Sequence, residues 1–421
     1  MTKKIENLEI EPIMKIRSIT YFDSPGRELE DAFIQRASRF PDLCRKSFQE
    51  TGLEIQTIRF ASPPFPLYLG NLPLQDQVDF SIGLESTLRE RGYEYISMGP
   101  ALPDYPASYQ AIPDLIQATE ATFCSAMMTS PAGVSLPAVR ACGEIIQALA
   151  PQDPNGFANL YFAALGNVPS GAPYFPAAYH DGESPAFAAA VEAADLAVES
   201  FKEATSFADA RERLIHAMEE VSGVISQAAK ELESASGAVY QGIDFSLAPF
   251  PEPALSIGTA LENLGIPQLG QHGSLAGAAF LADCIDRAEF PHTGFSGLML
   301  PVMEDAVLAK RAADGSLGVT DLLLYSAVCG TGLDTVPLPG DCSPEELSGL
   351  LMDLAALSLR LDKPLTARLM PIPGKAAGDL TNFDFPFFAN SRVLALKSPG
   401  VNGLFSGMGS LDIKPRSGSL G

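Results

Sequence analysis

The sequence predicts an α/β protein built on one large barrel or wound sheet. Short apolar runs alternate with longer amphipathic runs along most of the 421 residues, a pattern typical of parallel strands covered by helices. About nine or ten of these runs have the length of strands. No linker between Asp23 and Pro415 is long and polar enough to mark a domain boundary. We therefore expect a single α/β domain over residues 1–415 and a disordered Ser/Gly-rich tail over residues 416–421.

The N-terminal half alternates strand-length and helix-length runs. Expected strands cover residues 13–22, 53–60, 93–98, 123–129 and 160–165. The run at 53–60 is closed by Ser-Pro-Pro-Phe-Pro, and proline cannot continue a strand because it lacks an N–H. Expected helices cover residues 28–50, 136–149, 184–205 and 208–234. In the last of these, Leu214, Met218 and Val221 recur at helical spacing.

The C-terminal half continues the alternation. Expected strands cover residues 243–247, 298–302 and 365–370, and expected helices cover 254–264, 274–288, 304–313, 320–328 and 344–361. Ser343 and Pro344 have the pattern of an N-cap and first helical residue. Loops rich in Gly, Pro and acidic residues occupy 244–249, 301–305 and 329–341. Because ligands of parallel α/β folds bind at the carboxyl ends of strands, we expect these loops to converge on one mouth or interior.

The charge of the chain excludes some partners. It has 28 basic and 51 acidic residues, a net charge of -23. Nucleic acids and anionic membranes are recognised by clustered Lys and Arg, so we expect neither as a partner. An acidic surface most simply serves solubility, and attraction of cationic ligands is the alternative.

The cysteines and the absence of long apolar runs indicate a cytoplasmic protein. The six cysteines are scattered and form no Cys-x-x-Cys pair, which is typical of reduced thiols. No run approaches the roughly 18 apolar residues of a membrane span. The first residues are polar and charged and have no apolar signal core.

The segment from Cys329 to Asp341 concentrates chemistry in a short loop. Its sequence, Cys-Gly-Thr-Gly-Leu-Asp-Thr-Val-Pro-Leu-Pro-Gly-Asp, combines a thiol, two carboxylates, glycines and prolines. Cys329 is a candidate nucleophile, although a buried cysteine also serves as an apolar filler. Asp341 has a second explanation as an organiser of the next helix, whereas Asp334 has no such local explanation.

Glu304 and Asp305 follow an expected strand and open an expected helix. Carboxylates in the first helical turn are favoured by the helix dipole, so capping alone explains them. The functional alternative is general acid/base catalysis or ligation of a hard cation, because Mg²⁺ and Ca²⁺ prefer oxygen ligands.

Other polar residues are candidates for ligand binding. Arg368 lies in an apolar strand and needs either an acidic partner, such as one of the loop carboxylates, or an anionic ligand. Three histidines, His180, His272 and His292, lie in loops beside glycines, and His180 and His272 are the candidates for ligand binding. The further candidates from Gly/Pro-rich segments are Asp244, Ser246, Asp341 and Asp379.

Four segments together carry a family resemblance. They are Ile243-Asp-Phe-Ser-Leu-Ala-Pro249, Gly294-Phe-Ser-Gly-Leu-Met-Leu-Pro-Val-Met-Glu-Asp305, Cys329 to Asp341, and Arg368-Leu-Met-Pro-Ile-Pro-Gly-Lys-Ala-Ala-Gly-Asp379. In this order they resemble the domain-of-unknown-function 711 family, most clearly from about Gly242 to Asp379.

The resemblance implies a fold rather than an activity. The fold of the family members is similar to the ten-stranded α/β barrel of pyruvate formate-lyase and related glycyl-radical enzymes. The resemblance also implies that the members form homodimers. Glycyl-radical enzymes carry an Arg-Val-x-Gly-aromatic motif near the C-terminus. Arg392-Val-Leu-Ala-Leu lacks its glycine and its aromatic residue, so we expect no glycyl radical.

The leading functional hypothesis is an enzyme of unassigned reaction acting on a small polar metabolite inside the barrel. Glu304, Asp305 and Asp334 would supply acid/base chemistry or hold a divalent cation such as Mg²⁺ or Ca²⁺. Cys329 would lie beside them, and Arg368 with one loop histidine would hold an anionic group. The alternative is a non-catalytic regulatory protein that binds a small molecule in the same pocket. Whether the protein is an enzyme stays open at this stage.

Overall fold

The framework of the computed structural model is a mostly parallel sheet. The structure describes residues 15–397 and 399–416. Residues 417–421 of the tail expected over 416–421, and the first residues of the strand expected over 13–22, therefore lie outside it. In the described part of the chain, nine strands pair in the order β10-β11-β7-β4-β3-β2-β1-β8-β9. Their bounds are β1 Lys15–Phe22, β2 Ile58–Ala61, β3 Tyr95–Ala101, β4 Thr122–Met127, β7 Phe162–Gly166, β8 Ala186–Glu192, β9 Val239–Ala248, β10 Gly332–Pro339 and β11 Leu365–Ile372.

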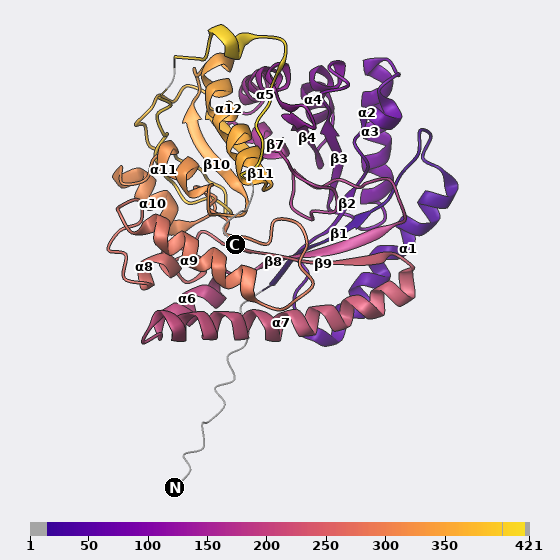
Figure 1. The fold of residues 1–421 in the computed structure, drawn as a ribbon. Helices are drawn as coiled ribbons and strands as arrows, with labels where there is room; N and C mark the ends of the chain where they lie inside the picture. The colour runs from indigo at the N-terminus through magenta and orange to yellow at the C-terminus, as the bar shows by residue number, and fades with distance from the viewer. Residues whose placement is uncertain (1–14, 398, 417–421) are drawn as a thin grey trace.

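Helices surround this sheet (Figure 1). They are α1 Asp31–Phe48, α2 Pro66–Leu69, α3 Leu74–Arg89, α4 Ala107–Gln117, α5 Leu136–Leu149, α6 Ala194–Lys202, α7 Phe207–Ser236, α8 Ile257–Asn263, α9 Ser274–Arg287, α10 Ala306–Asp314, α11 Val319–Tyr325 and α12 Pro344–Leu361. Among the described residues, no helix has the length and apolar character needed to cross a membrane.

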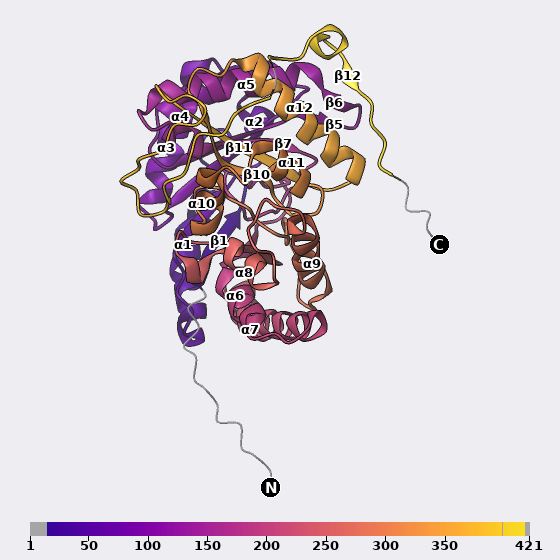
Figure 2. The same ribbon diagram turned by 90° about the vertical axis from the view of Figure 1, so that its left-hand side faces the viewer.

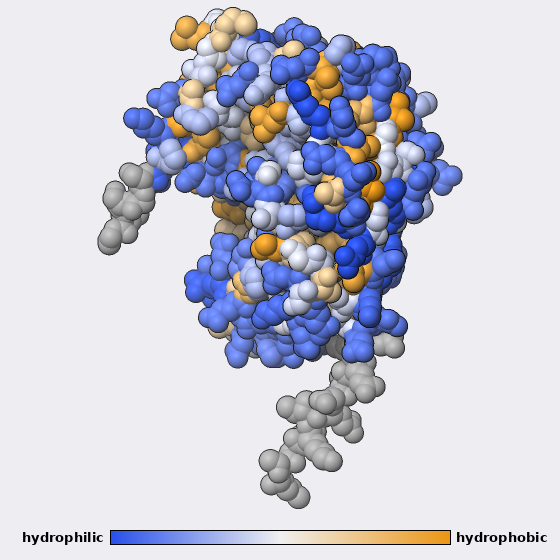
Figure 3. All heavy atoms as spheres, turned by 90° about the vertical axis from the view of Figure 1, so that its right-hand side faces the viewer, coloured by the Kyte–Doolittle hydropathy of each residue, from blue (hydrophilic) through white to orange (hydrophobic). Residues whose placement is uncertain are grey.

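A short second sheet ties the C-terminal arm to the N-terminal half. It consists of β12 Ser410–Leu411, β6 Gly133–Ser135 and β5 Thr129–Ser130. Figure 2 shows the arm, in yellow, beside these strands. The face drawn in Figure 3 is mostly hydrophilic, with apolar residues scattered over it.

The strands run in two directions. Strands β1, β2, β3, β4 and β7 are parallel neighbours, whereas β8 is antiparallel to β1 and β11 is antiparallel to β7. The carboxyl ends of the strands therefore do not all meet at one edge of the sheet. The expected convergence on one mouth therefore needs correction. Convergence on an interior is found for two of the segments, 244–249 and 301–305, because Asp244, Ser246 and Glu304 meet side chains from other strands at the inner face of the sheet.

Alternation along each strand separates two environments. On β2, Ile58 and Phe60 belong to the large core under the helices, and the Phe60 ring lies 5.4 Å from the Phe33 ring of α1. The alternate residues, Arg59 and Ala61, face the opposite side of the sheet. On β3, Ile96 packs under the helices in the same way, and Tyr95 faces inward. One face of the sheet thus builds the core, and the other builds an interior.

The segment over residues 291–302 contacts both edges of the sheet. At the β9 edge, the Ile243 N–H donates to the Pro291 carbonyl at 2.8 Å, and the Thr293 N–H donates to Ile243 at 3.1 Å. At the β10 edge, the Val302 N–H donates to the Asp334 carbonyl at 3.1 Å. Since both edges reach the same segment, the sheet is strongly curved.

Most expected elements are present, but the expected helix over 184–205 is wrong in its first half. Residues Ala186–Glu192 form strand β8, and helix α6 begins only at Ala194. Alanine favours helices in isolation. Here the small side chains let β8 lie between β1 and β9, where Ala188 and Ala189 are buried. Tertiary packing overrides the local propensity.

The expected loop over 329–341 is also corrected, because residues Gly332–Pro339 form strand β10. Its prolines are tolerated since β10 is the last strand in the order of the described sheet, with β11 on one side and only the bridge to Pro301 described on the other. A break in register between Leu333 and Val336 accommodates Thr335, whose φ is 41°. The expected strand over 298–302 is reduced to a single bridge between Pro301 and Asp334.

We expect Gly330→Ala to lower the free energy of unfolding by about 1–3 kcal/mol. A Cβ on Gly330 would lie 2.5 Å from the Cα of Gly297, so the two backbones cross in contact. Chemical denaturation measures the change. Gly223→Ala is a matched control inside α7, where an added Cβ meets nothing within 4 Å, and it should not destabilise the protein. A Gly330→Ala variant as stable as the wild type would contradict the close approach.

Candidate functional site

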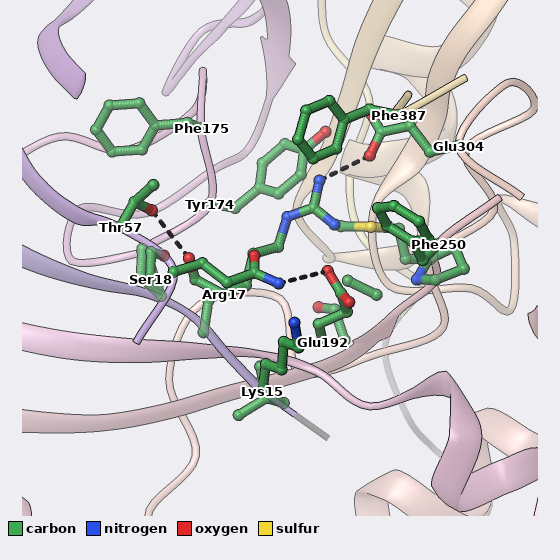
Figure 4. A pocket seen from close by; sticks show the side chains of 18 of the residues that line it. Lys15, Arg17, Ser18, Thr57, Tyr174, Phe175, Glu192, Phe250, Glu304 and Phe387 are labelled. Carbon is green, nitrogen blue, oxygen red and sulfur yellow. Dashed lines mark hydrogen bonds and ion pairs between the residues drawn. The ribbon is translucent and has the colours of Figure 1, made fainter. Parts of the chain in front are cut away.

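The inner face of the sheet lines a cavity of about 750 Å³. Side chains reach it from β1, β2, β3, β4, β8, β9 and β11, and loops close to residues 173–175, 249–252 and 385–388 complete it. Figure 4 shows the cavity from close by. Its volume lies in the range of small-molecule sites in proteins.

A chain of ion pairs crosses the wall of the cavity. Glu304 accepts from Arg17 Nη2 at 2.7 Å through Oε2 and from Arg368 Nη2 at 2.6 Å through Oε1. Arg368 Nε also donates to Asp334 Oδ1 at 2.6 Å. Glu304, Arg368 and Asp334 are all buried. Figure 4 shows the Arg17 guanidinium turned toward Glu304, with Tyr174 beside the pair.

The ion pairs fix the charge states of these groups. Burial alone would raise the pKa of Glu304, but Arg368 and Arg17 outweigh it and hold the pKa below the ordinary value. Burial opposes the charge of Arg368, yet Asp334 and other neighbours raise its pKa well above the ordinary value. Glu304 is therefore held as a carboxylate between two guanidinium groups, which does not suit it to donate a proton.

Arg59 on β2 differs from Arg17 and Arg368 because it has no carboxylate partner among the described residues. Its Nε donates to Thr57 Oγ1 at 2.8 Å, and no described carboxylate forms an ion pair with it. Its guanidinium carbon lies 5.1 Å from the centre of the Phe175 ring and 5.4 Å from that of Tyr95. Burial, together with the positive charge of Arg17, lowers the pKa of Arg59 to about 9.

Two hydroxyl groups in the cavity wall lack partners of good geometry. Ser18 Oγ on β1 and the Tyr174 hydroxyl are buried, and among the described residues neither finds a hydrogen-bond partner. Burial is also the main reason that the pKa of Tyr174 is raised well above its ordinary value. Oδ2 of Asp334, next to this group, is likewise unpartnered. Buried polar groups of this kind are costly unless a ligand or water satisfies them.

Asp244 and Ser246 on β9 also line the cavity. The Asp244 carboxylate accepts from the N–H groups of Phe295 and Ser296, each at 3.0 Å, and from the Ser246 hydroxyl. Burial nevertheless raises the pKa of Asp244. The carboxylate thus fastens the segment that contacts both sheet edges, while one side of it faces the cavity.

Asp305 lies outside the cavity wall and joins two helices. It is the N-cap of α10 and accepts from Val307 N and Leu308 N at 2.9 and 3.0 Å. It also accepts from Ser256 Oγ at 2.6 Å and Ile257 N at 2.7 Å, where α8 begins. The capping explanation from the sequence is confirmed. Burial raises the pKa of Asp305 although these donors oppose the shift.

The remaining candidates do not line the cavity. Cys329 is buried and free, and burial raises the pKa of its thiol, which disfavours a nucleophilic thiolate. His180 is buried, with Nε2 3.3 Å from the Glu183 carbonyl oxygen. His272, Asp341 and Asp379 are exposed. Asp379 accepts from the Ala376 N–H at 2.8 Å within a local turn.

The described residues do not form a set of ligands for a divalent cation. Among the described residues, no group of three or more His, Cys, Asp and Glu side chains is placed to hold a metal ion. Glu304 and Asp334 are occupied by arginines, and Asp305 by helix N–H groups. The residues therefore do not fit the Mg²⁺ or Ca²⁺ site considered from the sequence.

Sequence reasoning found part of the site and missed two of the three arginines that line the cavity. Glu304, Arg368, Asp244 and Ser246 line the cavity, and Asp334 contacts Arg368 directly. The missed residues are Arg17, Ser18, Arg59 and Tyr174. A signal was present for Arg59, which interrupts the apolar run Ile-Arg-Phe at the inward position of a strand.

The fold and the site define an α/β protein with a mostly parallel sheet around an arginine-rich cavity. A family model described as uncharacterised ACR (DUF711) matches residues 11–390, and the chain belongs to this family. It is 30% identical over 362 residues to a UPF0210 protein of Pyrobaculum arsenaticum, covering 82% of this chain and 79% of the relative. A UPF0210 protein of Acetivibrio thermocellus is 27% identical over 400 residues, covering 90% of this chain and 88% of the relative.

Proposed function

We propose that this protein binds a small organic molecule in the central cavity. The observation that carries the proposal is the Nη1–Nη2 edge of Arg59, which borders the cavity and has no acceptor among the described residues, while only Nε is occupied, by Thr57. A guanidinium that is taken out of water without an acceptor is costly. A ligand that accepts from this edge explains why Arg59 is held beside the cavity without a carboxylate partner.

Catalysis on that molecule is a second candidate, favoured by Asp244. This carboxylate lines the cavity, and burial raises its pKa, which is the direction of shift expected of a carboxyl group that transfers protons. Glu304 is a weaker candidate for proton transfer, because two arginines keep it ionised. If Asp244 does not transfer protons, the protein binds its ligand in the same pocket as a non-catalytic regulatory protein.

We also propose that the curved sheet encloses the cavity as a barrel resembling that of pyruvate formate-lyase. Its support is the segment over residues 291–302, which bonds to both β9 and β10 and would act as the closing strand. A homodimer is the assembly we propose. Exposed apolar side chains such as Leu404 and Met408, 93% and 81% exposed, support it, and light scattering of the purified chain tests it.

The binding proposal predicts that a bulky side chain in the cavity abolishes ligand response. We expect at least one compound in a panel of organic acids, amines and sugars, each at millimolar concentration, to raise the melting temperature of the wild type. Ala190→Phe should remove that shift, because Ala190 lines the cavity from β8. Ala377→Phe, on an exposed turn, is the matched control and should respond like the wild type. A compound that shifts both variants equally, or a panel without any response, would contradict the proposal.

A further inference from the structure

We propose that the ligand of the cavity is a carboxylate with an apolar, preferably aromatic, body, and that its carboxylate binds Arg59. This inference rests on the proposed small-molecule function and names the class of ligand. The body would lie against an aromatic wall beside Arg59, formed by Tyr95, Phe123, Tyr161 and Phe175.

The free edge of Arg59 has the geometry of a carboxylate receptor. Its Nε is occupied by Thr57 Oγ1, and among the described residues no acceptor is bound to Nη1 or Nη2. The two Nη atoms form a planar fork that matches the two oxygens of a carboxylate. The other two arginines that line the cavity carry carboxylates on this edge: Arg17 donates to Glu304, and Arg368 donates to Glu304 and Asp334.

Charge in the surroundings of Arg59 favours one added negative charge. The groups that act on it are Arg17 and Arg368, which oppose its charge, and Glu304 and Tyr95, which favour it. Glu304 is already shared by Arg17 and Arg368. Within this group Glu304 and Asp334 offset Arg17 and Arg368, which leaves the charge of Arg59 for a monoanion to balance. Lys15, Glu54, Glu192 and Glu252 also line the cavity, and Lys15 pairs with Glu54. A phosphate dianion would bring an excess of negative charge close to Glu304.

The aromatic wall defines the rest of the ligand. The Phe123 ring lies 4.7 Å from Tyr161, 5.2 Å from Phe175 and 5.3 Å from Tyr95, measured between ring centres. Arg59 stacks over two members of this cluster, Tyr95 and Phe175. A ligand whose carboxylate meets the free edge of Arg59 therefore has apolar ring surface beside it, which favours an apolar body over a sugar.

The test compares acids with their neutral amides. Benzoate, phenylacetate and 3-phenylpropanoate are titrated against the wild type by calorimetry, together with benzamide and the corresponding amides. We expect at least one acid to bind about tenfold or more tightly than its amide. Arg59→Gln should weaken that acid by about tenfold or more and leave the amide unchanged. Arg45→Gln, which removes an exposed arginine paired with Glu94, is the control and should bind like the wild type.

The dependence on pH gives a second readout that needs no variant. Binding of a carboxylate requires Arg59 in its charged form, and the pKa of free Arg59 is lowered to about 9. Affinity for the acid should therefore fall as the pH rises through about 9, as Arg59 loses its proton. Affinity for the amide should not change with the protonation of Arg59. The comparison of acid with amide decides the question even where Arg59→Gln fails to fold.

Several results would overturn the inference. Equal binding of acid and amide, equal binding of the acid to wild type and Arg59→Gln, or tighter binding of phenyl phosphate than of every acid would each exclude a carboxylate at Arg59. In these cases the cavity still binds small molecules, provided that Ala190→Phe abolishes binding, and the proposed function stands. If no compound binds the wild type and the broader panel also fails, both proposals fall.

Discussion

Replacing Glu304 with glutamine is expected to lower the free energy of unfolding by about 3–5 kcal/mol. The carboxylate lies between Arg17 and Arg368, with each oxygen accepting from a different guanidinium. Glutamine keeps one acceptor oxygen and turns an NH₂ group toward the second arginine, where it cannot accept. The variant thus leaves one buried cation without its partner and removes the negative charge that offsets both.

Denaturation with urea measures this loss. Glu120→Gln is the matched control, because Glu120 pairs with Arg89 at 2.8 Å but is 82% exposed. Exposed pairs contribute about 0–1 kcal/mol, so the control should remain close to the wild type. A Glu304→Gln variant within the same range would show that the buried network carries no net stability.

The pH dependence of stability provides a further check on Glu304. Its pKa is lowered in the folded state, so its contribution is present above the unfolded pKa and is lost as the pH falls through the folded pKa. In Glu304→Gln this titration is absent, and the loss of stability in acid should become shallower. If the variant loses stability in acid as steeply as the wild type, Glu304 is not held ionised by its arginines.

Local sequence signals predicted those elements whose causes are local. Ser343 is the N-cap of α12 and Pro344 its first residue, as the sequence pattern indicated. The structure adds that Glu346 completes a capping box. Strand β8 could not be predicted in this way, because its alanines are helix formers that only the neighbours β1 and β9 force into a strand. Strand β10 was missed because its prolines and glycine are typical of loops, and only its edge position permits them.

The residues of the site likewise divide into those that local sequence predicts and those that only the tertiary structure brings together. The need of Arg368 for an acidic partner followed from its apolar surroundings, and its ion pairs with Asp334 and Glu304 confirm that prediction. Arg17 and Arg59 were not recognised, because the sequence does not show which strands become neighbours or which cation keeps a free edge. That distinction depends on the order β3-β2-β1-β8 in the sheet, a product of tertiary structure.

Asp305→Ala is expected to cost about 3 kcal/mol or more in the free energy of unfolding. The carboxylate accepts from Val307 and Leu308 at the start of α10 and from Ser256 and Ile257 at the start of α8. Alanine removes all of these acceptors in a fully buried position. The loss exceeds that of a single N-cap, which is typically about 1 kcal/mol.

Chemical denaturation of two further variants separates capping from charge. Asp305→Asn keeps Oδ1, which serves Ser256, Val307 and Leu308, and loses Oδ2, which serves Ile257 and Gly258. It should therefore fall between the wild type and alanine. Ser206→Ala removes the exposed N-cap of α7, where Ser206 accepts only from Asp209 N, and should cost about 1 kcal/mol.

The same variants decide whether Asp305 has a chemical role. Its side chain does not line the cavity, so a folded Asp305→Asn protein should keep the ligand response of the wild type. Near wild-type stability combined with loss of that response would reverse the assignment. Asp305 would then belong to the chemistry that the sequence suggested for it, and the hydrogen bonds to α8 and α10 would position the carboxylate for that purpose.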